Sequence, residues 1–251
     1  MQLGQKLLYP IGTSKSCRFA AVFLKQSGFL LTDHPSPEIT HLLLDVPSFN
    51  PEGLLQDGSD LKGLLRMLPQ NITVIGGGLD REILENYKKT DLLKDPRFQA
   101  RNAAITAECA LQVAMSYLST TIKDSPTLIL GWGRIGKCLA KLLDCMGCSV
   151  TVAARKESDR AMLEGLGYRA VEFTRMKDEL LQHRLLFNTV PQGITLPEYC
   201  GSCVKIDLAS LPGLQGDNIH AARGLPGKLS PESTGKLIAQ TVCRLDKEES
   251  E

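Results

Sequence analysis

The sequence has no strong excess of charge of either sign, no long apolar run, and no repeats or low-complexity segments. Its 251 residues carry 29 lysines and arginines against 28 aspartates and glutamates, a formal net charge of +1. This balance gives no indication of binding to nucleic acid or to an anionic membrane surface. No apolar run approaches the roughly 18 residues of a membrane-spanning helix. The first residues, MQLGQKLLYP, lack the pattern of a signal peptide, and we therefore expect a cytoplasmic protein.

One stretch, Thr127–Lys137 (TLILGWGRIGK), carries the strongest functional signal. A short, mainly apolar run suited to a buried strand, Thr127–Leu130, precedes a G-x-G-x-x-G run. Apolar residues at helical spacing follow it, and a second apolar strand covers Ser149–Ala153. In such a unit Gly131 makes the tight turn, Gly133 lets the backbone approach a pyrophosphate, and Gly136 allows close helix–strand packing. The pyrophosphate then lies at the helix N-terminus. The spacing predicts a dinucleotide site; the alternative is a glycine-rich turn in another α/β unit.

The end of the second strand indicates which dinucleotide is bound. An NAD site usually has an acidic residue there, which holds the ribose 2′-hydroxyl. Here the sequence reads SVTVAARKESDR, with Ala153 or Ala154 at the acidic position, followed by Arg155 and Lys156. Cations without a carboxylate suit a 2′-phosphate, so we expect NADP as the cofactor. The alternative is that both cations are ordinary solvated loop charges.

Apolar strands alternating with helices predict an α/β fold with parallel sheets. We expect a Rossmann NAD(P)-binding domain at 125–245, preceded by a smaller N-terminal flavodoxin-like α/β domain at 1–100 on the substrate side. An interdomain helix at 101–124 and a frayed tail at 246–251 complete the prediction. In the N-terminal domain, strands are expected at 6–10, 41–46, 71–75 and 91–95, and helices at 19–26 and 61–68. A helix at 106–118 should join the domains, with Thr106 as its N-cap. In the Rossmann domain, helices are expected at 134–146, 158–166, 176–183 and 230–245, and later strands at 168–172, 185–187, 204–208 and 218–222.

Ligands of parallel sheets lie beyond the carboxyl ends of the strands, which defines the expected site. In the N-terminal domain, the loops 12–15 and 76–79 should face the interdomain cleft. The first could cradle an anion, although Thr13 or Ser14 capping the next helix is the simpler interpretation. The expected cofactor-binding residues are Gly131, Trp132, Gly133, Arg134, Ile135, Gly136, Ala154, Arg155, Lys156, Asn188, Thr189, Val190, Pro191, Leu208, Ala209 and Ser210.

Eight cysteines include two C-x-x-C pairs, Cys145/Cys148 and Cys200/Cys203, a spacing also found in zinc sites. Each pair precedes a strand of the Rossmann domain. In the strand order 3-2-1-4-5-6 these two strands lie three places apart, roughly 14 Å at about 4.8 Å per strand. One tetrahedral ion cannot span that distance. We expect free thiols and no bound metal, with a redox role for the second pair as the alternative.

Several runs resemble a known family. IDLASLPG (206–213) and GLPGKLSPESTGKLIA (224–239), supported by NTVP, NAAITAECALQ and VAAR, are similar to the A-subunit family of dipicolinate synthase over roughly residues 100–245. More distantly, the architecture resembles alanine and D-2-hydroxyacid dehydrogenases. The resemblance implies an NADP-linked oxidation of a dihydrodipicolinate-type ring to the dicarboxylate, during spore formation in the mother-cell cytoplasm. It also implies a flavoprotein-like second subunit, and dehydrogenases of this architecture usually form homodimers.

An aromatising oxidation needs a hydride acceptor, cations for two carboxylates, and a base. The candidate carboxylate-binding residues are Lys15, Arg134, Arg223 and Lys228. Lys228 and Glu108 are the candidate catalytic residues, although each could be a solvated or capping charge. The four histidines match no expected dehydrogenase position. Two other functions stay open: an NAD(P) dehydrogenase acting on another small carboxylate, and a non-catalytic NADP-binding subunit or sensor.

Overall fold

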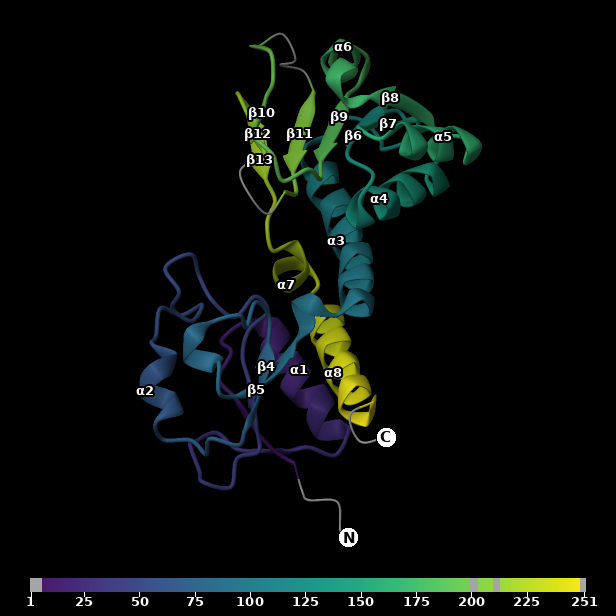
Figure 1. Cartoon of the computed structure of the whole chain (residues 1–251). Coiled ribbons are helices and arrows are strands. Elements are labelled where there is room, and N and C mark those ends of the chain that lie inside the picture. Colours follow the sequence, from purple (N-terminus) through teal and green to yellow (C-terminus); the bar gives the residue numbers. More distant parts are fainter. Residues whose placement is uncertain (1–5, 199–202, 210–212, 249–251) are drawn as a thin grey trace. The chain divides into compact units, whose positions relative to one another are not determined.

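The computed structural model describes residues 6–198, 203–209 and 213–248. The chain divides into two compact units: a first unit, Met1–Asn102 with Pro226–Glu251, and a second unit, Ala103–Leu225. The chain crosses from the first unit to the second within helix α3 (Pro96–Tyr117) and returns within helix α7 (Leu225–Leu229) (Figure 1). No helix in these described ranges is long and apolar enough to cross a membrane.

The second unit contains a six-stranded parallel sheet in the order β13-β11-β9-β6-β7-β8. Numbered within the unit this is 6-5-4-1-2-3, the strand order of a dinucleotide-binding Rossmann sheet, so the predicted fold class is confirmed. The elements of this unit are β6 (Thr127–Leu130), α4 (Arg134–Cys145), β7 (Val150–Ala154), α5 (Glu157–Gly165), β8 (Arg169–Glu172), η3 (Phe173–Arg175), α6 (Met176–Glu179), η4 (Leu180–Gln182), β9 (Leu185–Asn188), β10 (Ile194–Thr195), β11 (Val204–Asp207), β12 (Leu214–Gln215) and β13 (Ile219–Ala221).

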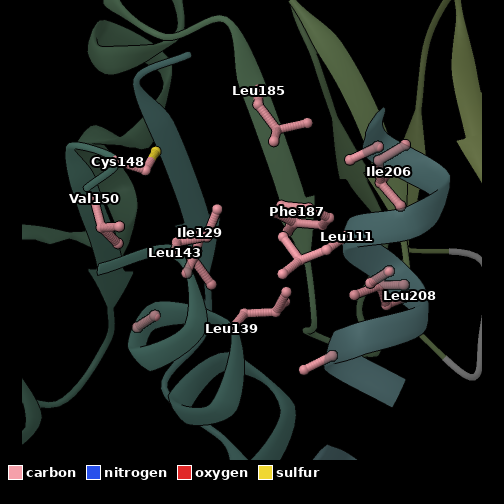
Figure 2. Packing of buried hydrophobic residues seen from close by; sticks show 14 of the residues in the cluster. Leu111, Ile129, Leu139, Leu143, Cys148, Val150, Leu185, Phe187, Ile206 and Leu208 are labelled. Carbon is pink, nitrogen blue, oxygen red and sulfur yellow. The ribbon is translucent and has the colours of Figure 1, made fainter. Parts of the chain in front are cut away.

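Both faces of this sheet are apolar, as expected for parallel strands covered on each side. One face packs against α3, α4 and α5 and forms the larger cluster of buried residues. Figure 2 shows Leu111 of α3 and Leu139 of α4 lying against the central strands near Phe187 and Ile129. Phe187 and Ile129 are fully buried, so the packed core holds the ends of β9 and β6 in place.

The first unit contains a five-stranded parallel sheet in the order β2-β1-β3-β4-β5. This is the flavodoxin-like order 2-1-3-4-5, and the second half of the fold prediction is therefore also confirmed. Its elements are β1 (Leu7–Pro10), α1 (Lys15–Gln26), β2 (Leu30–Leu31), β3 (His41–Leu43), α2 (Leu61–Leu65), β4 (Thr73–Gly76), η1 (Glu82–Leu84), β5 (Lys88–Asp91), η2 (Leu92–Lys94) and α8 (Pro231–Glu248).

The closing helix α8 differs from its prediction as part of the domain at 125–245. It belongs to the first unit and packs on α1, where a Cβ at Gly235 would lie 2.5 Å from the Phe19 Cβ and 2.7 Å from the Ser16 carbonyl oxygen. The tail predicted to fray from residue 246 is helical as far as Glu248, and Asp246 pairs with Lys6. Helical periodicity predicted the apolar face of α8, but periodicity does not specify which partner covers that face.

Helix α3 begins ten residues before the predicted N-cap at Thr106, and that prediction was wrong. The Asp95 carboxylate accepts a 2.6 Å hydrogen bond from the Phe98 backbone N–H, and Pro96 occupies the first helical position, where proline is well tolerated. Asp95 also pairs with Arg244 of α8 at 2.7 Å. Glu108 therefore lies in the middle of the helix and has no capping role.

The remaining differences lie in helix ends and short elements. Helix α1 begins at Lys15 rather than at residue 19, and the helix predicted at 176–183 is divided between α6 and η4. The two-residue strands β2, β10 and β12 were not predicted, and β5 was expected three residues later, because its sequence KKTD has no apolar alternation. The loop predicted around residue 228 folds as the short helix α7.

Candidate functional site

The glycine loop after β6 has the geometry that its spacing predicts. Gly131 has φ +98°, a conformation that side chains rarely adopt, and a Cβ there would lie 2.7 Å from Thr189 Oγ1. A Cβ at Gly136 would overlap the Gly131 carbonyl oxygen, so the first turn of α4 can approach the strand only with glycine. A Cβ at Gly133 would meet no heavy atom within 4 Å among the described residues. Gly133 thus opens onto space that a ligand can occupy.

Helix α4 begins directly beside that space. Its N-cap is Gly133, and no side chain of the described chain bonds the N-cap position. The uncapped N–H groups of the first turn and the positive end of the helix dipole suit an anionic group. Gly133 and Arg134 are exposed. The ring centroid of Trp132 lies 6.1 Å from that of Tyr168 and 5.7 Å from Lys137 Nζ.

The strand ends beside the glycine loop carry the next group of predicted cofactor residues. β6, β9 and β11 are consecutive in the sheet, so the segments after them share one edge. Thr189 is tied to the β6 end, since its N–H and Oγ1 donate to the Leu130 carbonyl at 3.0 and 2.8 Å. Val190 packs close to Gly131. The predicted residue Ser210 lies outside the described ranges.

A buried polar pair, Asn188 and Asp207, braces these strand ends. Asn188 is fully buried; its Nδ2 donates to Asp207 Oδ1 at 2.8 Å and to the Val190 carbonyl at 3.2 Å, while its Oδ1 accepts from the Val190 N–H. Asp207 also accepts from the backbone N–H groups of Ala209, Gly213 and Leu214 at 3.2–3.3 Å. The Asn188 side chain is therefore used inside the protein, and it shapes the loop rather than presenting its amide to a ligand.

Arg223, predicted to hold a substrate carboxylate, already has protein partners. Its Nε donates to the Ala209 carbonyl at 3.0 Å, and its Nη2 lies 3.7 Å from Asp207 Oδ2. The Arg223 side chain is 43% exposed, and its contacts with Ala209 and Asp207 fix the segment after β11. Sequence reasoning missed the role of Asp207 because its partners lie on three separate segments.

The end of β7 carries the cations that predict NADP. Ala154 is buried as the last residue of the strand, and Arg155 and Lys156 are both exposed. Arg160 of α5, which the sequence analysis did not single out, donates from Nη1 to the carbonyls of Ala154 and Arg155 at 3.0 and 2.8 Å. On the neighbouring strand β8, an acidic residue, Glu172, is the register partner of Ala154.

In the first unit, the glycine loops are filled by carboxylates of the protein itself. Asp45, 7% exposed, accepts from the N–H groups of Thr13 and Ser14 at 2.9 and 3.1 Å and also from the Ser14 hydroxyl. Ser14 caps α1, as the simpler interpretation predicted. Asp91 likewise accepts from Gly78 and Leu79 N–H at 3.0 and 2.8 Å. The prediction that residues 12–15 cradle a ligand anion is therefore not supported.

The remaining candidates lie in different units. Lys15 begins α1 and Lys228 lies on α7, both exposed in the first unit. These two segments adjoin, because a Cβ at Gly227 would lie 3.3 Å from Ser16 Oγ. Glu108, exposed in the middle of α3, belongs to the second unit together with Arg134 and Arg223.

Cysteines in the described part of the chain are free thiols and belong to no cluster of three or more metal-ligating side chains. Cys200 lies outside the described residues. The sheet order places β9 and β6 between the strands that follow Cys148 and Cys203, which is the separation that the zinc argument assumed. Cys148 hydrogen-bonds Thr127 Oγ1 at 3.3 Å, and burial raises its pKa.

Together, the doubly wound sheet and its glycine loop define a dehydrogenase-type α/β protein. No family model matches the chain. Over 190 residues, 68% of this chain, it is 27% identical to the A-subunit of dipicolinate synthase from Bacillus subtilis (strain 168). The alignment covers 64% of that relative's length.

Solved structures agree with the sequence match. The dipicolinate synthase A-subunit from Bacillus halodurans matches with a TM-score of 0.81 and 21% identity, over 96% of this chain and 98% of that one. The D-lactate dehydrogenase of Salmonella matches with a TM-score of 0.58 and 11% identity, over 98% and 97% of the two chains. The resemblance to the A-subunit family of dipicolinate synthase is thus confirmed, with the dehydrogenase-like fold of both units.

Proposed function

We propose that the chain binds NADP through its second unit and works as an oxidoreductase of the dipicolinate synthase A-subunit type. The observation that carries this proposal is the space beside Gly133 at the uncapped start of α4, next to a strand end that carries Arg155 and Lys156. The open space beside Gly133 supports the proposed pyrophosphate position, and the two cations support the choice of a ligand with a 2′-phosphate. The sequence similarity to the dipicolinate synthase A-subunit supports the choice of reaction.

The proposed reaction is the oxidation of a dihydrodipicolinate-type ring to dipicolinate. The ring loses a hydride to the nicotinamide and a proton to a base, so two hydrogens leave and an aromatic ring forms. In the first unit, Lys15 and Lys228 are proposed to bind substrate carboxylates. In the second unit, Arg223 is a further proposed carboxylate-binding residue and Glu108 the proposed acid–base group. Lys15 and Lys228 start from adjoining segments of the first unit, which suits a ligand with two anionic groups.

The proposed partners, by analogy with the family, are a second copy of the chain in a homodimer and a flavoprotein-like second subunit. Two other functions remain in view. The chain could be a dehydrogenase for another small carboxylate, or a non-catalytic NADP-binding subunit or sensor. The specific observation in favour of the sensor is that Arg223 and the 12–15 loop already have protein partners. Few of the candidate residues are therefore available to bind the carboxylates of a substrate.

Calorimetric titration with NADP and NAD tests the cofactor. We expect tighter binding of NADP, and a loss of about tenfold for NADP in Arg155→Ala, equivalent to one charge-assisted hydrogen bond. NAD binding should be nearly unchanged. The matched control is Arg184→Ala. Arg184 is an exposed arginine that directly precedes β9, so it lies at the amino ends of the parallel strands, away from the glycine loop at their carboxyl ends. Equal or tighter binding of NAD by the native chain would contradict the NADP assignment.

Dipicolinate binding in the presence of NADP tests the reaction class. Since Lys228 is exposed, Lys228→Met should weaken binding only about twofold to fivefold, the effect of a solvated ion pair. Lys62→Met, which removes an exposed lysine from α2, should have no effect. Native binding weaker than about 1 mM, a free energy of roughly −4.1 kcal/mol, would favour the sensor or the other-substrate function.

A further inference from the structure

Arg160 lies in the first turns of α5 and is half-buried against the end of β7. Its Nη1 carries two N–H groups, and both have acceptors: the carbonyls of Ala154 and Arg155, at 3.0 and 2.8 Å. These two carbonyls belong to the last residue of β7 and to the first residue after it, at the point where a dinucleotide ribose lies in this fold. One guanidinium nitrogen thereby closes the turn that carries Arg155 and Lys156.

The Arg160 guanidinium can favour a ligand phosphate in two ways. Carbonyl oxygens that point toward an anion repel it, and donation from Arg160 offsets the partial negative charge of both. The Nε and Nη2 groups of Arg160 have no hydrogen-bond partner within residues 6–198, 203–209 and 213–248. In a guanidinium these two nitrogens form an edge with parallel N–H groups, which matches two oxygens of a phosphate.

We propose that Arg160 determines specificity for the 2′-phosphate: through Nη1 it positions the Ala154–Lys156 turn, and through its Nε–Nη2 edge it binds the phosphate. This inference rests on the proposed function, because it requires the second unit to bind NADP. The charges around the turn also include Glu157, Asp159 and Glu172. Glu172 matters most, since it stands in register with Ala154 and would accept a ribose hydroxyl if NAD were the ligand.

The experiment compares binding of NADP and NAD, and of 2′,5′-ADP and 5′-AMP, by calorimetry at one ionic strength. In Arg160→Gln, NADP and 2′,5′-ADP should bind at least about tenfold more weakly, while NAD and 5′-AMP change by less than about twofold. Arg160→Lys keeps the charge, but its single ammonium lacks the Nε–Nη2 edge that can bind two phosphate oxygens, so it should recover only part of the loss. Arg184→Gln is the matched control and should bind all four ligands as the native chain does.

A double-mutant cycle tests the positioning role. If Arg160 orders the turn, Arg155→Ala should weaken NADP binding less in the Arg160→Gln background than in the native one. Glu172→Gln, which removes a like charge from beside the phosphate, should strengthen NADP binding. If Glu172 instead holds a ribose hydroxyl, that variant weakens NAD binding and the inference is overturned.

The outcomes separate this inference from the proposed function. Preference of the native chain for NADP, with equal losses for NADP and NAD in Arg160→Gln, would make Arg160 a structural residue and overturn the inference alone. Preference of the native chain for NAD, or no dinucleotide binding, would overturn both. Should Arg160→Gln fail to fold, Arg160→Lys decides: NADP affinity equal to the native value overturns the inference, and a loss restricted to the 2′-phosphorylated ligands supports it.

Discussion

Replacing Gly133 by valine should abolish dinucleotide binding and leave the protein folded. A Cβ at this position meets no heavy atom within 4 Å in the described chain, and the backbone angles, φ −81° and ψ −172°, are open to any residue. The expected cost to folding is therefore that of a poorer N-cap, about 1 kcal/mol or less. In the bound state, however, the valine methyl groups would occupy the space of the pyrophosphate. Losing two charge-assisted hydrogen bonds there costs about 3–6 kcal/mol, or 10²–10⁴-fold in affinity.

Gly136→Ala is the matched contrast, because its Cβ would overlap the Gly131 carbonyl oxygen and also lie 3.6 Å from Ile129 Cγ2. A shift of helix against strand costs about 1–3 kcal/mol, so this variant should lose stability first. Urea unfolding followed by circular dichroism measures stability, and calorimetry measures NADP binding. The single tryptophan, Trp132, lies inside the loop, and its fluorescence gives an independent signal of binding. Micromolar NADP binding by Gly133→Val with a native unfolding curve would refute the pyrophosphate assignment.

Three further predictions concern other parts of the chain. Burial acts to raise the pKa of Asp95, but its hydrogen bonds to a backbone N–H and to Arg244 hold that pKa below the usual range. Asp95→Asn should therefore cost about 1–2 kcal/mol of unfolding free energy at neutral pH. The difference should shrink as the pH falls below the unfolded-state value of about 3.9 and through the lower folded-state pKa; a constant difference in urea unfolding down to acid would contradict it. Burial and the Asp45 carboxylate raise the pKa of the Cys17 thiol to about 12, so iodoacetamide at mildly alkaline pH should alkylate the exposed Cys145 long before Cys17, as peptide mass mapping can check. Metal analysis of untagged protein should find no stoichiometric zinc, since two strands separate those that follow the C-x-x-C pairs; one zinc per chain would contradict this.

The sequence predicted both sheets because parallel strands and glycine loops are encoded locally. Each buried strand is an apolar run of a few residues, and the G-x-G-x-x-G loop contains its own turn, opening and packing contact. Helix α8 shows where local information ends: its apolar face was predictable, but its partner α1 lies more than 200 residues away in the sequence. The start of α3 was missed for a related reason. Asp95-Pro96 is as consistent with a strand-ending turn as with a capped helix, and the Arg244 contact that favours the capped helix is also distant in sequence.

The loops after β1 and β6 show how similar local sequences acquire opposite roles. Each loop follows a parallel strand, contains glycine and precedes a helix, so the sequence alone made both of them candidate anion sites. After β1, the Asp45 carboxylate fills the loop and accepts from two backbone N–H groups. After β6, no side chain of the described residues bonds the N-cap position, and the space next to Gly133 is open. A carboxylate already in place repels a second anion, whereas an uncapped helix start attracts one. An anionic cofactor group should therefore bind after β6 and be excluded after β1, a difference that arises from Asp45, 32 residues beyond Thr13.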